Sequence, residues 1–250
     1  MFWSRQKSQG EIRELEIGRI RLLAVDVAGT LTDDRRLIYP EVIYALRKLE
    51  KAEIPVSIVT GNSFMAAYKI AQYFGLSGPI IAESGAVVYD PVLKKRILVG
   101  DPELGRKAVN LIVKELGLTP SFLNRYRDVD FIFEKNGDIG AERIRKICKE
   151  HNLEIRVSDS KFLIHVCDKK VNKGTGLIEA CKLRGIPLSQ VAAIGDSWID
   201  LEMLKVVGLP IAVFNSPEEL KQVAKIVTKK PDGEGVIEVI EEYLLGEITS

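Results

Sequence analysis

The sequence has few of the residues that mark an oxidised or a membrane-spanning protein. Only three of its 250 residues are cysteines, Cys148, Cys167 and Cys181, and no two of them have C-x-x-C spacing. A sparse, odd number of cysteines is typical of free thiols in a reducing compartment, so we expect a cytoplasmic protein with buried, unpaired cysteines. No apolar run approaches the ~20 residues that a membrane-spanning helix needs, and we expect no membrane association.

The net charge is close to zero, and histidines are few. The chain has 36 basic and 35 acidic residues, a formal net charge of +1. This balance argues against a nucleic-acid partner, because such proteins carry a marked basic excess. The two histidines, His151 and His165, have no neighbouring partners that suggest a metal site, so we interpret both as structural. No G-x-G-x-x-G follows Val25, which disfavours a dinucleotide-binding enzyme.

Apolar residues, in contrast, make up 46% of the chain, enough for one large domain or for a core with a smaller second domain. From Ile20 onward, strand and helix patterns alternate, which predicts βαβ units and a parallel sheet. The predicted strands are 21–26, 55–60, 79–82, 191–194, 209–213 and 226–227. The predicted helices are 41–52, 63–74, 174–183, 201–206, a short one from Pro217, and 236–245.

The alternation is interrupted in the middle of the chain. Two helices (106–116, 141–150) occur there among strands that read as antiparallel (87–89, 96–99, 131–133, 155–157, 162–166). This pattern indicates an inserted α+β domain. We therefore expect an extension at 1–18, a core at 19–86 and 166–250, and an inserted domain at 87–165 that can overhang the carboxyl ends of the core strands.

The first predicted strand ends in a carboxylate. The apolar run Leu22–Val25 leads to Asp26, and a turn with Gly29 and Thr30 follows. In an open parallel sheet, ligands gather at the carboxyl ends of the strands. A carboxylate there can attack phosphorus or ligate Mg²⁺. On its own, such an aspartate is more often a turn or cap residue.

Three further polar features follow at equivalent strand–helix junctions. Thr60–Gly61–Asn62 offers a hydroxyl and backbone N–H groups to a phosphoryl oxygen. Lys173 begins a predicted helix and offers a positive charge to a phosphate. Asp196 and Asp200 lie one helical turn apart and can face one metal ion. Each alone has an ordinary reading as a turn, a surface lysine or a cap, but their common position predicts one site.

The order and spacing of these features resemble the four motifs of the haloacid dehalogenase (HAD) superfamily of phosphohydrolases, over roughly residues 20–245. The resemblance implies an α/β fold, a Rossmann-like parallel-sheet core with an inserted C2-type cap. It implies a catalytic role for Asp26 as the nucleophile, with Thr60 and Lys173. It implies that Thr60, Gly61, Asn62 and Lys173 bind the substrate's phosphoryl group, and that Asp26, the backbone carbonyl of Ala28, Asp196 and Asp200 hold Mg²⁺.

Within the superfamily the sequence is similar to archaeal phosphoglycolate phosphatases with a small cap. The similarity rests on segment 123–128, which resembles an N-R-x-R-E stretch found there. Arginine suits carboxylate or phosphate recognition, and we expect Arg125 rather than Arg127 to bind the substrate; a solvated basic loop is the alternative reading. The resemblance implies a small phosphorylated metabolite, foremost 2-phosphoglycolate, with a sugar phosphate as the alternative. A homodimer is plausible, although no sequence feature requires it.

The sequence departs from the family at one important position. The usual first motif is D-x-D-G-T, and Ala28 stands where the second aspartate would protonate the leaving oxygen and later activate water. Losing such a group typically costs ~10²–10⁴-fold in rate. Three readings stay open: an impaired phosphatase, a relay through Asp33, Asp34 or Glu83, and a catalytically silent phosphate-binding protein. A phosphonate hydrolase is disfavoured, because residues 33–55 are too few for the cap that it needs.

Overall fold

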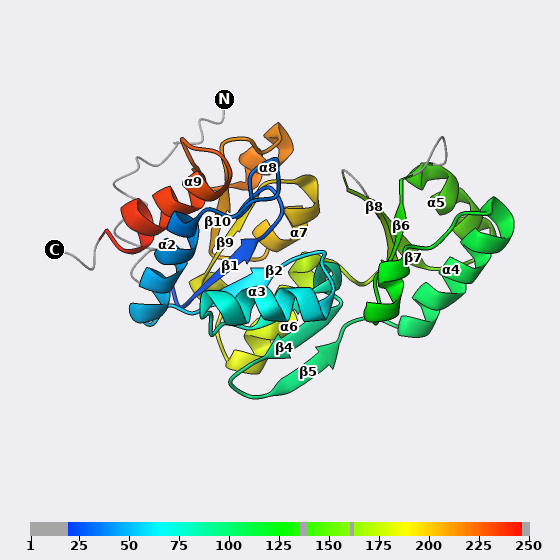
Figure 1. Cartoon of the computed structure of the whole chain (residues 1–250), viewed down its shortest axis with the longest axis horizontal. Coiled ribbons are helices and arrows are strands. Elements are labelled where there is room, and N and C mark those ends of the chain that lie inside the picture. Colours follow the sequence, from blue (N-terminus) through cyan, green and yellow to red (C-terminus); the bar gives the residue numbers. More distant parts are fainter. Residues whose placement is uncertain (1–19, 136–139, 161–162, 247–250) are drawn as a thin grey trace, which may run out of the picture.

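The computed structural model describes residues 20–135, 140–160 and 163–246, so the extension expected at 1–18 lies outside the described residues. A large sheet forms the core, with the strand order β11-β10-β9-β1-β2-β3-β4-β5 (Figure 1). Its strands are β1 (Leu22–Asp26), β2 (Val56–Val59), β3 (Ile80–Ala82), β4 (Val87–Asp90), β5 (Lys95–Leu98), β9 (Val191–Gly195), β10 (Leu209–Ala212) and β11 (Ile226–Val227). All of these pairs are parallel except β3–β4 and β4–β5.

Helices cover both faces of this sheet. The helices on one face are α2 (Pro40–Lys51), α3 (Phe64–Phe74) and α9 (Asp232–Glu238), and those on the other are α6 (Lys173–Arg184), α7 (Leu201–Leu204) and α8 (Glu218–Val223). Along β1, Leu23 and Val25 pack on the first face while Leu22 and Ala24 pack on the second. Burial on both faces explains why β1 is apolar throughout rather than alternating.

A second, smaller sheet stands apart from the core, at the right of Figure 1. Its strand order is β6-β8-β7 and its pairs are antiparallel: β6 (Phe131–Glu134), β7 (Ile155–Asp159) and β8 (Leu163–Asp168). Helices α4 (Pro102–Leu116) and α5 (Ala141–Glu150) pack on one face. Helix α4 begins four residues before its expected start, because Asp101 accepts a hydrogen bond from Glu103 N and Pro102 occupies the first turn.

Two expected elements differ from the structure. The hairpin at 87–99 was expected in the inserted domain, but β4 pairs with β3 and therefore extends the core sheet. The short turn Glu83–Gly85 returns the chain beside β3, a contact that strand patterns alone do not specify. The last helix is not continuous from 236 to 245: α9 ends at Glu238, and a π-helical segment, Val239–Leu244, follows.

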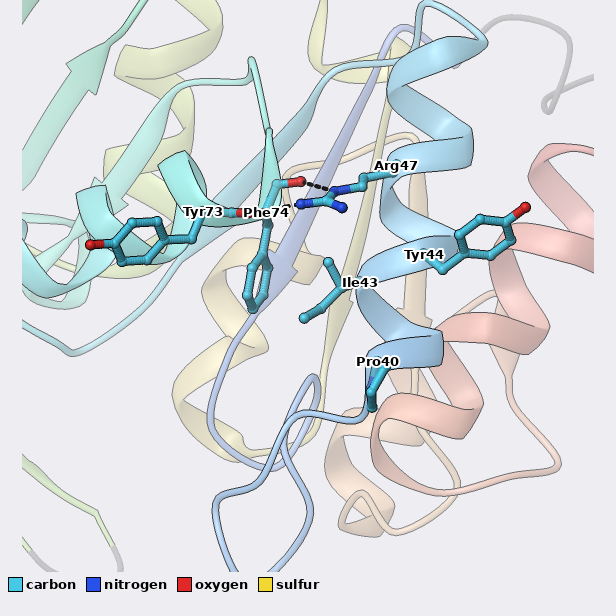
Figure 2. A pocket seen from close by; sticks show the side chains of 6 residues that line it. All are labelled: Pro40, Ile43, Tyr44, Arg47, Tyr73 and Phe74. Carbon is cyan, nitrogen blue, oxygen red and sulfur yellow. Dashed lines mark hydrogen bonds between the residues drawn. The ribbon is translucent and has the colours of Figure 1, made fainter.

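A shallow apolar groove lies between α2 and α3 (Figure 2). The Arg47 guanidinium crosses it and donates to the carbonyl oxygens of Tyr73 and Phe74, at 2.9 Å each. None of its lining residues belongs to the predicted site. The three cysteines are buried and unpaired, as expected. Within the described ranges, no helix combines the length and the apolar character needed to cross a bilayer.

Candidate active site

Three carboxylates meet at the carboxyl edge of the core sheet. Asp26 ends β1, and Asp196 and Asp200 follow β9. Strands β1 and β9 are parallel neighbours, with Val25 opposite Ile194, so their ends fall at the same edge. One carboxylate oxygen from each aspartate lies within 4.8 Å of the other two. The strand pairing thus brings together residues that are far apart in the sequence.

Lys173 lies in the middle of this cluster. Its ammonium nitrogen is 2.5 Å from Asp26 Oδ1 and 2.5 Å from Asp200 Oδ1, and its side chain is only 5% exposed. The helix that carries it starts with a capping box, in which Asn172 and Thr175 satisfy each other's backbone N–H groups. This cap fixes the first turn of α6 and so directs Lys173 toward the carboxylates.

The cluster has more negative than positive charge. Burial raises the pKa of Asp26 to about 6 despite the nearby Lys173. Burial, with the charges of Asp26 and Asp200, raises the pKa of Asp196 to about 8. Burial disfavours the charged form of Lys173, but Asp200 and Asp26 hold its pKa above the ordinary value. A divalent cation would relieve this excess, and an all-oxygen donor set suits Mg²⁺ or Ca²⁺.

The turn after β1 fits closely against this cluster. Gly29 has φ +88°, and a Cβ atom there would lie 2.4 Å from Asp196 Oδ2. The Thr30 hydroxyl donates to Asp196 Oδ1 at 3.0 Å, a contact that sequence reasoning did not include. Ala28 is exposed, so this position has room for a larger side chain but has no proton to donate.

Thr60 lies at the end of the neighbouring strand. Val59 is opposite Asp26 in the β1–β2 pairing, so Thr60 reaches the same edge as the carboxylates. Its buried hydroxyl accepts a hydrogen bond from Asn62 N at 3.2 Å, which leaves the O–H free to donate. Asn62 itself is exposed. The Thr60 hydroxyl is thus a donor that this loop can offer to an anion, and phosphoryl binding by Thr60, Gly61 and Asn62 stays a prediction.

The two cap arginines lie in different environments. Arg125 is exposed in the 3₁₀ turn Phe122–Tyr126 and makes no hydrogen bond or ion pair with the described residues. Arg127 instead turns toward the core, where it donates to Gly61 O at 2.9 Å and to Asp130 Oδ2 at 2.8 Å. The geometry therefore gives Arg127 a role in holding the cap on the core and leaves substrate binding by Arg125 a prediction.

Two of the three carboxylates that could replace the missing aspartate, Glu83 and Asp33, make structural contacts, and a relay through Asp34 stays a prediction. Glu83 is fully buried, and its carboxylate accepts hydrogen bonds from the backbone N–H groups of cap residues 128, 129 and 130. Asp33 accepts hydrogen bonds from Arg35, Leu37 and Tyr39 of its own loop. Their oxygens are thus occupied by structural contacts.

Comparison with known proteins settles the family. The sequence model of the haloacid dehalogenase-like hydrolases matches residues 23–138 and 120–240. The chain belongs to this family. The hydrolase is 33% identical over 231 residues to a phosphoglycolate phosphatase of Sulfolobus acidocaldarius, covering 92% of this chain and 99% of that protein. It is 36% identical over 222 residues to one of Archaeoglobus fulgidus, covering 88% and 96%. These relatives make it a HAD-type phosphatase.

Solved structures show the same fold. Thermoplasma acidophilum 0175 superposes on the hydrolase with a TM-score of 0.81 at 25% identity, covering 90% of this chain and 99% of that one. A haloacid dehalogenase-like hydrolase of Bacteroides thetaiotaomicron gives a TM-score of 0.75 at 19% identity, covering 89% and 99%, which bears on the fold alone. The expected α/β core with a cap domain is thereby confirmed.

Sequence reasoning missed one polar pair of this hydrolase near Gly61. His165 on β8 and Asp130, just before β6, are joined by a 2.7 Å contact between His165 Nδ1 and Asp130 Oδ2. A signal for the histidine was present in the sequence, since it alternates with the buried Ile164 and Val166 and must therefore face away from them. No sequence signal pointed to Asp130 as its partner.

Proposed function

We propose that this phosphatase hydrolyses a small phosphomonoester with Mg²⁺, through an aspartyl-phosphate on Asp26, and that 2-phosphoglycolate is its substrate. One observation carries the proposal: the Lys173 ammonium joins Asp26 and Asp200 while Asp196 lies within 4.8 Å of both. This arrangement supports Asp26 as the nucleophile, Lys173 as the cation that binds phosphate, and the three aspartates as metal ligands.

Asp26, Asp196, Asp200 and the backbone carbonyl of Ala28 are the proposed Mg²⁺ ligands. The fit rests on three clustered carboxylates and on the raised pKa values of Asp26 and Asp196. When bound, the ion neutralises phosphoryl charge and orients the group for in-line attack. Replacing the Ala28 side chain leaves this set intact, because position 28 contributes only its main chain.

The reacting atoms follow from these positions. An Asp26 carboxylate oxygen attacks phosphorus as the bond to the leaving oxygen breaks. Lys173, Thr60 and the N–H groups of the loop after β2 hold the phosphoryl oxygens. Water then attacks the aspartyl-phosphate and regenerates Asp26. Ala28 takes no part in proton transfer, and without a replacement the barrier rises by roughly 3–5 kcal/mol.

The proposed substrate rests on the relatives and on the small cap. The two relatives described above are named phosphoglycolate phosphatase, and the chain is 33% and 36% identical to them. We take the cap to comprise residues 101–168, since β4 and β5 belong to the core sheet. The cap closes over the site and limits the leaving group's size. A sugar phosphate is the alternative substrate. Cytoplasmic location and a homodimer stay predictions.

A catalytically silent phosphate-binding protein is the second candidate function. The observation that favours it is the exposed methyl group of Ala28, which stands at the site without a proton to give. In that case phosphate and Mg²⁺ would bind, but no ester would be hydrolysed even with Ala28→Asp. The two candidates therefore differ in a simple activity assay.

The experiment measures phosphate release from 2-phosphoglycolate, glucose 6-phosphate and p-nitrophenyl phosphate, with Mg²⁺ or with EDTA. We expect Mg²⁺-dependent release that is highest for 2-phosphoglycolate and lost in Asp26→Asn. Preference for the sugar phosphate would contradict the substrate assignment. Release that Asp26→Asn does not change would contradict the proposed nucleophile.

A further inference from the structure

His165 lies on the face of the cap sheet that helices leave uncovered. Its strand neighbours Ile164 and Val166 point into the cap's apolar core against α4 and α5. Side chains alternate along a strand, so His165 points the opposite way, toward the core domain. Its register partners on this face are Ile132 on β6 and Ser158 on β7. The histidine is thus in the middle of the surface that the cap presents to the site.

A carboxylate fixes the orientation of this ring. Asp130 Oδ2 is 2.7 Å from His165 Nδ1 and also accepts hydrogen bonds from Ser84 Oγ at 2.9 Å and from Arg127 Nη2 at 2.8 Å. Burial opposes the charged form of Asp130, but His165 and Arg127 hold its pKa below the ordinary value. A charged carboxylate at Nδ1 keeps a proton on that nitrogen and leaves Nε2 as the nitrogen that can exchange one.

The free nitrogen lies next to the phosphate-binding loop. A Cβ atom on Gly61 would be 3.3 Å from His165 Cε1 and 3.8 Å from Nε2, so the ring stands directly over the residue after Thr60. Nε2 makes no hydrogen bond with the described residues, and it does not belong to their buried, unpartnered polar atoms. It therefore keeps a small accessible area, although the His165 side chain is only 8% exposed, and it lies beside the loop that we propose holds the phosphoryl group.

We propose that His165, oriented by Asp130, is the general acid and base of this phosphatase and takes the place of the aspartate that Ala28 replaces. The proposal rests on the proposed function and deepens it. Ala28 has no titratable atom, and the carboxylates of Glu83 and Asp33 are occupied by structural hydrogen bonds. His165 lies beside the loop, and its Nε2 makes no hydrogen bond with the described residues.

The proton transfers balance over the two steps. As Asp26 forms its bond to phosphorus and the phosphorus–oxygen ester bond breaks, His165 Nε2 gives its proton to the leaving oxygen, which departs as an alcohol. The neutral ring then takes a proton from the water that attacks the aspartyl-phosphate. The bond from phosphorus to Asp26 breaks, inorganic phosphate leaves, and both side chains return to their starting states.

His165→Asn is the sharpest variant, because an asparagine amide can still donate to Asp130 in place of Nδ1 while Nε2 is removed. It is compared with the parent, Ala28→Asp and the double variant, and His151→Asn, at an exposed position in the cap, is the matched control. Steady-state turnover of 2-phosphoglycolate tests the alkoxide leaving group. Single-turnover release of p-nitrophenolate reports the first step with a leaving group that needs no proton.

We expect His165→Asn to lower 2-phosphoglycolate turnover at least ~10²-fold and to leave single-turnover p-nitrophenolate release within about threefold. Ala28→Asp should raise turnover at least ~10²-fold in the His165→Asn background but much less in the parent. Such non-additive effects are expected if His165 and an aspartate at position 28 perform the same proton transfer. That rescue also shows that the variant is folded. His151→Asn should behave as the parent does. If His165→Asn does not fold, His165→Gln takes its place.

Equal slowing of both leaving groups by His165→Asn would overturn the proposal and leave His165 a contact between cap and core. Unchanged 2-phosphoglycolate turnover would overturn it as well. A silent parent beside an active Ala28→Asp would also overturn it while the proposed function stands. If every variant, including Ala28→Asp, is silent with both esters, the proposed function fails and this proposal falls with it.

Discussion

At the scale of single residues, the chemistry of the site depends on charged side chains that are buried close together. One ammonium, Lys173, lies among the carboxylates of Asp26, Asp196 and Asp200, and burial makes the charged forms of Asp26 and Asp196 costly. Such a cluster is easier to protonate than isolated aspartates are, and it binds a divalent cation better once it is deprotonated. Both properties can be measured without a substrate.

The metal-free protein should become less stable as pH rises. Asp26 and Asp196 titrate at about 6 and about 8 when folded, above their ordinary value of 3.8. The unfolded chain therefore loses these protons at a lower pH than the folded protein does. As a result, the free energy of unfolding falls as pH rises from about 4 to about 8. Mg²⁺ should raise Tm little at pH 5.5. At pH 8.5, a hundredfold excess over Kd should stabilise by about 2.7 kcal/mol, or about 5–10 °C.

Differential scanning fluorimetry with Mg²⁺ or EDTA at the two pH values measures this effect, and Asp196→Asn is the variant that should lose most of it. A Tm shift of the same size at pH 5.5 and pH 8.5 would contradict the assignment of the raised pKa values to the metal ligands.

Gly29→Ala should weaken Mg²⁺ binding and turnover by at least ~10-fold each. Its Cβ would lie 2.4 Å from Asp196 Oδ2, and φ +88° is unfavourable for alanine, at roughly 1–3 kcal/mol. Gly117→Ala is the matched control, since Gly117 also has a positive φ, +63°, but nothing within 4 Å of its Cβ position. Titration calorimetry with Mg²⁺ and kcat measurements should separate the two variants. If they behave alike, close packing of Gly29 on Asp196 is not important.

At the scale of elements, two kinds of contact assemble the site. Parallel pairing of β1 with β2 and β9 aligns the ends of strands and so brings Thr60 and the carboxylates to one edge. Contacts from the turn after β3 then attach the cap: Glu83 accepts N–H groups of cap residues 128–130, and Ser84 donates to Asp130. These contacts from the turn determine which cap residues reach the core.

Glu83→Gln should therefore destabilise the protein by about 2 kcal/mol or more. The buried glutamine NH₂ group would face backbone N–H groups of residues 128–130, and two hydrogen-bond donors cannot pair with each other. Glu219→Gln is the control, since Glu219 is exposed on α8, and it should change the free energy of unfolding by less than about 0.5 kcal/mol. Urea unfolding of the two variants tests this prediction. Equal stabilities would mean that the cap is held on the core by other contacts.

At the scale of the whole molecule, the sequence predicts the core better than the contact between core and cap. Asp26, Lys173 and Asp196 could be placed because each lies at or just after the end of a strand or at the start of a helix, and parallel pairing of β1 and β9 then aligns the strand ends. Arg125 and His165 could not be placed in this way. Their roles depend on how the cap packs against the core, through long-range contacts such as Arg127 with Gly61 O, and a local pattern carries no information about these.

The same limit explains why the sequence did not predict which sheet the 87–99 hairpin joins. Strands 87–89 and 96–99 were recognisable, but the sheet they join depends on the turn at Glu83–Gly85, in which Glu83 and Ser84 both have positive φ. Neither residue type favours that conformation, so the sequence gives little warning of the tight return. Because β4 and β5 join the core sheet, the second sheet and its helices begin only after β5.

The most direct test of the account is a rapid-quench experiment with ³²P-labelled 2-phosphoglycolate and Mg²⁺, in which the protein is acid-precipitated and its label counted. We expect transient, hydroxylamine-sensitive label on the parent protein, none with EDTA, and none on Asp26→Asn, together with loss of phosphate release in that variant. Phosphate release that persists in Asp26→Asn, or turnover of the parent with no labelled protein at any quench time, would contradict an aspartyl-phosphate mechanism at Asp26.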